Sequence, residues 1–451
     1  MVIKFHIGID NTDSIYGGCT TYVGALIIEE LLKIKGINFV DYPNLIRLNP
    51  NIPWKTRGNG AIALRIEILN DEIIDRIKEK VVKKVFESSR IDEGAEPAVA
   101  FLRGEIPKLL RNFSVDVIRR LVNLEETIRI AKESHVEFVT LEENKNKGIV
   151  GAVSAIGMTM EEDYTFELLA YRKKENYGKK RMVDEKSVYE MDRLTSPYTF
   201  NNIDYNERRI LITPRGPDPV LFGIRGETPK ILLAALKKLK IYEPIERWVI
   251  YRTNQGTDNH FKHTKDLMNI REYDSVKVCG TICTSPKIIQ GGHTILTMTD
   301  GKNNIKCIIY EPTGHLRKIA YHLLPGDIIE VYGSVKKSGK EDLTINVEKI
   351  YIKKIAHIKE KVNPKCPTCN STMKSEGKNK GYECKKCKYK ANLVKIEIEK
   401  VRSIIEGLYM PTPKAQRHLT KPLIRYGQEK EKHQIKLIKN WYWSETIKCR
   451  E

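Results

Sequence analysis

No stretch of this 451-residue sequence approaches the run of about 18 apolar residues that a membrane-spanning helix requires. Its first residues, MVIKFHIGIDNTD, lack the long apolar region and the small-residue cleavage site of a signal peptide. The sequence also lacks a Walker A motif, G-x-x-x-x-G-K-[ST], so it gives no support for a P-loop fold. We therefore expect a cytoplasmic protein without a membrane partner, in which any ATP site is built in another way.

Cysteine is scarce and unevenly spaced. Five of the nine cysteines are scattered, namely Cys19, Cys279, Cys283, Cys307 and Cys449. The other four form two C-x-x-C pairs, Cys366 with Cys369 and Cys384 with Cys387. Two such pairs complete a tetrahedral zinc site with no position left open for a substrate. The sequence therefore predicts one structural zinc, and it gives no support for a disulfide framework.

Acidic residues are scarce only in the C-terminal part of the chain. Residues 351–451 contain 25 basic and 10 acidic residues, a net charge of 25 − 10 = +15. Residues 1–350 contain 53 and 48, a net charge of 53 − 48 = +5. Positive charge localised in this way predicts that the C-terminal fifth binds a polyanion such as nucleic acid. The alternative is a charged surface that only keeps the protein soluble.

The hydrophobic pattern up to about residue 265 alternates between strand and helix periodicity, which predicts an α/β or α+β region without fixing its strand order. The predicted strands are 2–9, 61–69, 136–141, 164–171 and 247–252, and the predicted helices are 20–36, 71–88, 114–133 and 228–240. The polar segment 253–265 is the predicted boundary of this region.

The pattern that follows is typical of a small β-barrel. Five strand-like runs, with a short helix at 315–323 between the third and the fourth, have the order of an OB-fold, although another all-β barrel stays open. These runs are 275–283, 293–299, 304–310, 327–335 and 342–354. The predicted domains are an α/β region at 1–268, an OB-fold at 269–356, a zinc ribbon at 357–396 and a basic tail at 397–451 with a helical, Lys-rich end.

Two turns near the N-terminus carry side chains suited to a metal–nucleotide. Asp10 and Asp13 directly follow a predicted strand, where carboxylates can hold Mg²⁺. Thr20 begins the next predicted helix, whose first backbone N–H groups suit phosphate. The turn KTRGNGA at 55–61 offers two cations beside flexible glycines, which suits phosphate as well. Each turn taken alone is equally compatible with an ordinary helix cap or a charged hairpin.

Together these segments resemble the archaeal tRNA(Ile) 2-agmatinylcytidine synthetase family. The resemblance rests on IGIDNTDS, GCTTY, LIRLNPNIPWKTRGNGA, GIVGAVSAIG, PRGPDPVLFGIRGE and AQRHLTKPLIRYG, with the barrel and the four-cysteine ribbon before the last of them. It covers nearly the whole chain in the same order. It implies that residues 1–268 are a catalytic region composed of an unusual kinase-like domain and a ferredoxin-like domain.

The resemblance also implies a reaction. An ATP-dependent ligase of this family replaces the 2-oxo group of the wobble cytidine in the CAU anticodon of tRNA(Ile) with agmatine, so that AUA is decoded. The oxygen on C2 is a poor leaving group, so the γ-phosphate of ATP would first be transferred to it, with ATP ending as AMP, before the amine displaces it. The wobble base would be flipped out to be reached. The implied partners are tRNA(Ile) and agmatine, with ATP, Mg²⁺ and a structural Zn²⁺ and no obligatory protein partner.

Site roles carry over to matching positions. Asp10 and Asp13 would hold Mg²⁺, and Thr20 matches a threonine of the family that becomes autophosphorylated. Asn11 stands where members often have a second aspartate, and it offers an oxygen ligand but no charge. The residues expected to contact the phosphates of ATP are Lys55, Arg57, Gly58, Asn59 and Gly60. Agmatine carries an amine and a guanidinium, and Asp204 and Asp218 are the carboxylates that we expect to meet it.

Two other functions stay open at this point. One is a non-catalytic RNA-binding protein that relies on its OB-fold and ribbon, and the other is a different ATP-dependent tRNA-modifying enzyme. ATP turnover that depends on both tRNA and agmatine would separate the three.

Overall fold

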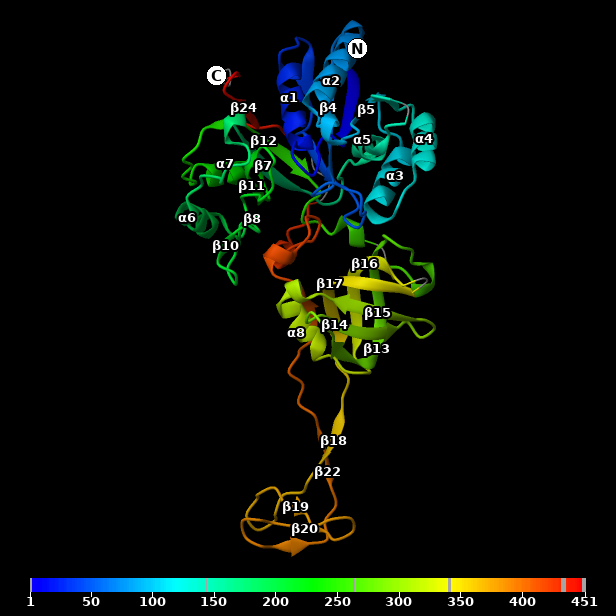
Figure 1. Ribbon diagram of the computed structural model, residues 1–451, viewed down its shortest axis with the longest axis vertical. Helices are drawn as coiled ribbons and strands as arrows, with labels where there is room; N and C mark the ends of the chain where they lie inside the picture. Colours follow the sequence, from blue (N-terminus) through cyan, green and yellow to red (C-terminus); the bar gives the residue numbers. More distant parts are fainter. Residues whose placement is uncertain (1, 143, 263, 340–341, 431–434, 448–451) are drawn as a thin grey trace.

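The computed structural model has three parts in a row, namely an α/β region that contains both ends of the chain, a β-barrel, and a small ribbon on a two-stranded arm (Figure 1). It describes residues 2–142, 144–262, 264–339, 342–430 and 435–447, so Cys449 lies outside the described residues. None of the helices in these ranges has both the length and the apolar character needed to span a bilayer.

One sheet of eleven strands runs through the whole α/β region. Its order is β6-β5-β1-β4-β3-β12-β7-β11-β8, with β2 paired to β4 and β24 paired to β12. The strands are β1 Ile3–Asp10, β2 Ile37–Phe39, β3 Asn44–Arg47, β4 Gly60–Ile68, β5 Ala98–Arg103, β6 Glu137–Thr140, β7 Thr165–Arg172, β8 Thr199–Phe200, β11 Val220–Gly226, β12 Ile245–Thr253 and β24 Tyr442–Ser444. A separate pair consists of β9 Ile203–Asp204 and β10 Arg209–Ile210.

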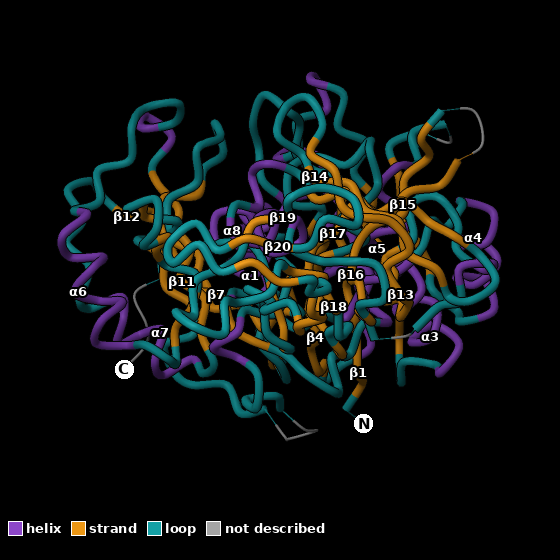
Figure 2. Tube along the Cα trace, turned by 90° about the horizontal axis from the view of Figure 1, so that it is seen from below, coloured by secondary structure: helices purple, strands orange, loops and turns teal. Residues whose placement is uncertain are grey.

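Helices lie at both ends of this sheet, with α6 and α7 at one end and α3 and α4 at the other (Figure 2). The helices are α1 Thr20–Leu32, α2 Ile74–Ser88, α3 Lys108–Arg119, α4 Leu124–Glu133, α5 Lys147–Gly157, α6 Glu185–Thr195 and α7 Pro229–Leu236. The prediction of one helix over 114–133 is wrong, because the chain turns between α3 and α4. Asn123 accepts a hydrogen bond from the backbone N–H of Glu126 and thereby caps α4.

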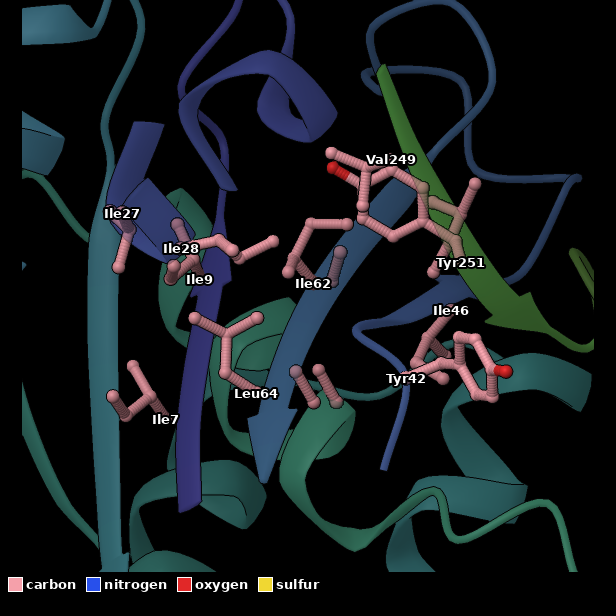
Figure 3. Packing of buried hydrophobic residues seen from close by; sticks show 14 of the residues in the cluster. Ile7, Ile9, Ile27, Ile28, Tyr42, Ile46, Ile62, Leu64, Val249 and Tyr251 are labelled. Atoms are coloured by element: carbon pink, nitrogen blue, oxygen red, sulfur yellow. The ribbon is translucent and has the colours of Figure 1, made fainter. Parts of the chain in front are cut away.

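Part of the core of the α/β region consists of aliphatic side chains between α1 and the sheet. Figure 3 shows Ile27 and Ile28 of α1 above Ile7 and Ile9 of β1, and all four are fully buried. On α5, glycine permits a closer approach to β1. A Cβ atom on Gly151 would lie 1.8 Å from the Asp10 carboxylate, so only glycine fits at this crossing.

A parallel pairing joins the two halves of the sheet. Arg252 of β12 lies opposite Asn44 of β3, and the next residues along each strand pair as well. Arg252 forms a buried ion pair with Asp41, and the hydroxyl of Tyr251 donates a 2.6 Å hydrogen bond to the carbonyl of Thr21. These contacts fix the residues after β1 and β3 relative to β7 and β11.

The barrel confirms the OB-fold prediction. Five strands close into a barrel because β15 pairs with both β14 and β17, and a helix lies between the third and fourth strands. The elements are β13 Ser275–Ile288, β14 Thr294–Thr299, β15 Asn304–Ile309, α8 His315–Tyr321, β16 Ile328–Ser338 and β17 Asp342–Lys354, with β23 Gly407–Tyr409 added beside β17.

A two-stranded arm connects the barrel to the ribbon. The arm consists of β18 Lys359–Val362 and β22 Ile396–Glu399, whose side chains are exposed except for the half-buried Val362. The ribbon contains β19 Lys374–Ser375, β20 Tyr382–Glu383 and β21 Lys390–Ala391. In Figure 1 it lies at the opposite end of the molecule from the α/β region.

The segment after β23 returns to the α/β region. The predicted helical end of the tail is wrong for residues 435–447, which contain β24 and no helix. Within the returning segment, Arg425 is fully buried and binds the carboxylates of Asp163 and Glu227. Lys430 also binds Glu227, so part of the positive charge of the tail is neutralised inside the protein.

Arg425→Ala tests how much this docking contributes to stability. The substitution leaves two buried carboxylates without their main cation, so we expect the free energy of unfolding to fall by about 3–5 kcal/mol. Arg129→Ala, which removes an exposed ion pair with Glu133, should change it by less than about 1 kcal/mol. Urea denaturation of both variants measures the difference. Equal stabilities would contradict a role for the buried cluster.

Candidate active site between the two halves of the sheet

A pocket of about 300 Å³ lies where the two halves of the sheet meet. Its walls come from the end of β1, the start of α1, the turn before β4, strands β7 and β11, and the returning segment. The predicted site residues that line it are Asp10, Asp13, Thr20, Lys55, Arg57, Gly58, Asn59, Gly60 and Asp218. Segments distant in the sequence therefore converge on one cavity, while the role of each residue stays a prediction.

Asp10 is a carboxyl group without a cationic partner among the described residues. Burial, opposed by a backbone hydrogen bond from Asn11 and assisted by the nearby charge of Asp13, raises the pKa of its carboxyl to about 7. A carboxylate in this position is electrostatically uncompensated, and a divalent cation would compensate it. The residues present therefore fit the predicted Mg²⁺.

Asp13 and Arg57, which were predicted for metal and phosphate respectively, bind each other. The Arg57 guanidinium donates a 2.6 Å hydrogen bond to Asp13 and lies 3.6 Å from the carboxylate of Asp218. Thr56 donates a 2.9 Å hydrogen bond to the other oxygen of Asp13. Arg57 thus bridges two carboxylates of the pocket, and both contacts are available for exchange when a charged ligand enters.

Thr20 is the first residue of α1 and is buried. Its hydroxyl oxygen accepts a 3.1 Å hydrogen bond from the hydroxyl of Thr12, and the preceding residue, Cys19, makes no side-chain cap. The first backbone N–H groups of α1 therefore lack a side-chain acceptor at the pocket wall, which suits an anionic ligand.

Asn11 has a structural contact that answers the question raised by its sequence position. It adopts a positive φ of 59°, which asparagine tolerates, and its side-chain oxygen accepts a 2.9 Å hydrogen bond from the backbone N–H of Glu96. This oxygen therefore holds the segment before β5.

The glycines of the turn before β4 make room for an arginine. A Cβ atom on Gly58 would lie 2.4 Å from the guanidinium of Arg47, and one on Gly60 would lie 3.0 Å from it. Asn59 holds the turn through a 2.8 Å hydrogen bond to the carbonyl of Asn49. The turn is therefore shaped to let Arg47 reach the pocket floor.

The structure adds charged residues that sequence reasoning missed. Glu167 is almost fully buried, and Arg225 donates a 3.1 Å hydrogen bond to it, while Gln255 binds its other oxygen. His418 of the returning segment lies 3.1 Å from Arg225, and the charge of Arg47, then burial, lowers the pKa of its imidazole well below the usual value. The sequence signal is a single acidic residue, Glu167, within a largely apolar strand, as in TFELLAYR.

Asp204 does not lie in the pocket, so its predicted place at the agmatine site is not supported by the structure. Its side chain is fully buried. One carboxylate oxygen accepts hydrogen bonds from the backbone N–H groups of Asn206 and Glu207, and the other accepts one from the backbone N–H of Lys414. Asp204 is thus a turn residue that holds the returning segment.

A second cavity of about 110 Å³ shares four residues with the pocket, namely Asp10, Asn11, Lys55 and Asn59. Its remaining wall is mainly apolar and includes Ile52, Leu121 and Val150, with the exposed ring of Trp54 at the rim. A flat aromatic ligand attached to a polyanion would fit the two cavities together.

The zinc ribbon brings its four cysteine sulfurs together. All lie within 4.8 Å of one another, and the pairs Cys366–Cys387 and Cys369–Cys384 are 3.4 Å apart. Four thiolates at about 2.3 Å from a tetrahedral zinc are about 3.8 Å apart, so the donor set fits Zn²⁺. The predicted grouping of four cysteine ligands around one structural site is confirmed.

Comparison with known proteins finds relatives over nearly the full chain. Family models match at residues 6–143 (TiaS TCKD domain), 146–260 (TiaS FLD domain), 274–353 (OB-fold nucleic acid binding domain) and 363–404 (TiaS C-terminal zinc ribbon domain). A Pyrococcus horikoshii relative, the isoleucine-tRNA 2-agmatinylcytidine synthetase TiaS, is 43% identical over 420 residues, which cover 93% of this chain and 96% of the relative.

Two solved structures share the fold over 94% of this chain and 97% of their own. One is a complex of TiaS with its isoleucine tRNA and ATP, with 34% identity and a TM-score of 0.82. The other is a complex of TiaS with the same tRNA, AMPCPP and agmatine, with 33% identity and a TM-score of 0.80.

Asp10→Asn tests the electrostatics of the pocket. Because the native pKa of about 7 exceeds the unfolded value of 3.8, the native state binds more protons between these values, and stability falls as pH rises through that window. Above pH 7 the variant should therefore melt several degrees higher than the wild type, without added metal or nucleotide, and the difference should shrink towards acidic pH. Asp71→Asn, at an exposed ion pair, is the control. A variant that melts lower at every pH would contradict this reading.

Cys384→Ser tests the metal site. The ribbon has a small core of its own, so loss of the metal should unfold it while the melting of the rest of the protein stays unchanged. Elemental analysis should find one zinc per wild-type chain and a severalfold loss in the variant, and protease should cut the variant within the ribbon. Cys283→Ser, an exposed cysteine of the barrel, should retain the metal. Wild-type protein purified without chelators and free of zinc would contradict the assignment.

Proposed function

This chain belongs to the TiaS family of tRNA(Ile) 2-agmatinylcytidine synthetases, and we propose that its central pocket joins agmatine to the wobble cytidine of tRNA(Ile). The chain is accordingly an ATP-dependent ligase that forms a carbon–nitrogen bond. The observation that supports the placement is the convergence of Asp10, Thr20, Arg57 and Asp218 from separate segments on one cavity.

The reaction needs two displacements. The O2 atom of cytidine attacks the γ-phosphorus of ATP, so that an O–P bond forms, the bond between the β- and γ-phosphates breaks and ADP is left. Hydrolysis of the remaining phosphoanhydride bond by water would convert this ADP to AMP and phosphate, so that ATP ends as AMP. The primary amine of agmatine then attacks C2, the C2–O bond breaks, and phosphate leaves with the electron pair. The amine proton passes to a carboxylate of the pocket. Asp218 suits this step, because burial raises its pKa and makes it a better base than an exposed aspartate.

Asp10 and Asp13 are the proposed holders of Mg²⁺, which would neutralise the phosphates of ATP. Arg57 would leave Asp13 for the phosphates while the turn from 58 to 60 stays in place around Arg47. We place the adenine in the neighbouring apolar cavity beside Trp54, because that cavity joins the pocket through Asp10 and Lys55. The triphosphate would then run towards Thr20.

Agmatine binding falls to Asp218 together with Glu167, which the sequence did not indicate. Both carboxylates line the pocket, and each is held by arginine side chains that orient its oxygens. A diamine-like ligand with a positive charge at each end needs two separated anions. The pocket provides them on separate elements, with Glu167 in β7, the neighbour of β11 in the sheet, and Asp218 in the loop before β11.

The barrel and the ribbon are the proposed tRNA-holding parts. The same anticodon sequence CAU occurs in elongator tRNA(Met), so the pocket alone does not distinguish the two substrates. Contacts far from the anticodon must do so, and the ribbon lies at the far end of the molecule from the pocket (Figure 1). The proposed location is the cytoplasm, where tRNA and ATP occur together.

A purely RNA-binding protein is the less favoured function. Such a protein would have no need of an uncompensated buried carboxyl at Asp10 in the wall of a pocket. A different tRNA-modifying activity is separated from the proposed one by its dependence on agmatine.

Thr20→Ala provides the experiment. Incubation of the wild type with tRNA(Ile), agmatine and γ-labelled ATP should yield a cytidine heavier by one agmatine less one water, and should also label the protein. The variant should lose protein labelling by at least tenfold, because the hydroxyl at the first position of α1 is removed. Thr21→Ala, whose hydroxyl lies 3.0 Å from Cys19 on the same wall, is the matched control and should keep the label.

Protein labelling and formation of the modified cytidine test different parts of the proposal. Undiminished labelling of Thr20→Ala would place the phosphate on another residue without affecting the proposed reaction. Product formation by the wild type in the absence of agmatine, or none in its presence, would contradict the reaction itself.

A further inference from the structure

A larger cavity lies on the other side of the loop that carries Asp218. It has a volume of about 1010 Å³, and its lining includes seven cationic and two acidic residues, a net charge of 7 − 2 = +5. Six of these cations project from three segments, namely Lys179, Lys180, Lys186, Arg208, Arg209 and Arg215. We call this cavity the cationic groove.

The six cations have no carboxylate partner among the residues that the structure describes. Among the described residues, none of their side chains forms an ion pair within 4.0 Å, whereas Arg57, Arg225 and Arg425 are all paired. Like charges gathered without counter-charges raise the local potential and favour a polyanionic ligand. The groove therefore differs from the basic tail, part of whose charge is already neutralised within the fold.

The groove and the active-site pocket share one wall. Pro214 lines both cavities, and Asp218 at the end of the same loop lines the pocket. Arg181, the seventh cation, fixes this loop by donating hydrogen bonds of 3.0 Å to the carbonyl of Gly216 and 3.1 Å to that of Asp218. A strand that delivers one base to the pocket can thus continue directly over the loop into the groove.

We infer that the cationic groove binds the sugar–phosphate backbone of the anticodon-loop nucleotides next to the target cytidine. This inference rests on the proposed function, because that function puts the flipped cytidine on the opposite side of the loop. Phosphates of a single strand are bound by unpaired arginines and lysines without regard to sequence. The groove would therefore hold the loop open while the pocket acts on one base.

One aromatic side chain adds a place for a neighbouring base. Tyr242 lines the groove and is 66% exposed, so its ring is accessible to a base that enters the groove. Single-stranded RNA is held by stacking of bases on such rings beside a basic track. The combination of unpaired cations and an exposed ring points to single-stranded RNA, because such a strand presents phosphates and bases to the same groove.

A triple variant tests the groove in the full-length protein. Arg208→Gln, Arg209→Gln and Arg215→Gln together should raise the KM for tRNA on the order of 10- to 100-fold with little change in kcat. The slope of log affinity against log salt should become shallower by about 2, since each phosphate contact on a single strand contributes about 0.7. The KM for ATP should not change.

The matched control removes three positive charges elsewhere. Arg76→Gln, Lys83→Gln and Lys132→Gln lie exposed on α2 and α4, outside the groove. This control should leave the KM and the salt slope within about twofold and about 0.5 of the wild type, respectively, if position rather than net charge matters. Equal effects of the two triple variants would overturn the inference.

Tyr242→Ala tests the stacking site. It should weaken tRNA binding roughly 5- to 100-fold, whereas Tyr242→Phe should bind like the wild type because the ring is kept. Protection of anticodon-loop nucleotides from hydroxyl radicals should be lost in the triple variant and kept elsewhere on the tRNA. Unchanged protection together with a raised KM for ATP would show that the groove holds nucleotide instead.

Failure of this inference and failure of the proposed function give different results. If the wild type modifies tRNA with agmatine but the groove variants behave like their control, only the groove assignment is wrong. If the wild type binds tRNA through the groove without using agmatine, the groove assignment stands and the proposed reaction is wrong.

Discussion

Two parallel residue pairs between β3 and β12 hold the two halves of the α/β region in one sheet, and the pocket depends on them. One half supplies the carboxyl group of Asp10 and the glycine turn around Arg47, and the other supplies Glu167 and the loop with Asp218. If the two halves belonged to separate domains, the distances between these pocket residues would change with every domain motion. Backbone hydrogen bonds across the junction, with the buried pair Arg252–Asp41 beside them, keep that spacing constant.

The returning segment ties the remaining parts to this sheet. Arg417 lies 3.2 Å from Glu348 of the barrel, and its neighbour His418 lines the pocket. Further along the chain, Leu423 begins the short turn that carries the buried Arg425. The chain therefore passes through barrel and ribbon before it completes the pocket. A protein cut after the first two domains would lack one pocket residue and the cation of a buried cluster.

Local patterns determined what could be predicted from the sequence. The four cysteines, the barrel strands and the turn around Asp10 each depend on residues close together in the chain, and the structure places them as expected. The junction depends on two residue pairs separated by about two hundred positions, for which a single sequence has no signal. The contacts of Asp204 could not be predicted, because the sequence does not tell whether backbone N–H groups already satisfy a carboxylate.

The prediction of a helix at the C-terminal end was wrong for a different reason. Its lysines favour an exposed helix, but Trp441 and Tyr442 pack into the core, and β24 pairs with β12. Tertiary burial of two aromatic rings outweighs the local preference of the segment.

The exposed arm between barrel and ribbon has a mechanical consequence. Its four-residue strands are held by a ladder of backbone hydrogen bonds, which resists stretching along the arm. Almost no side chain on either face is buried, so little opposes bending or twisting. The arm is thus stiff along its length and flexible in bending. It sets how far the ribbon stands from the barrel but leaves its angle adjustable, and a small rotation at its base becomes a large sweep at the metal site.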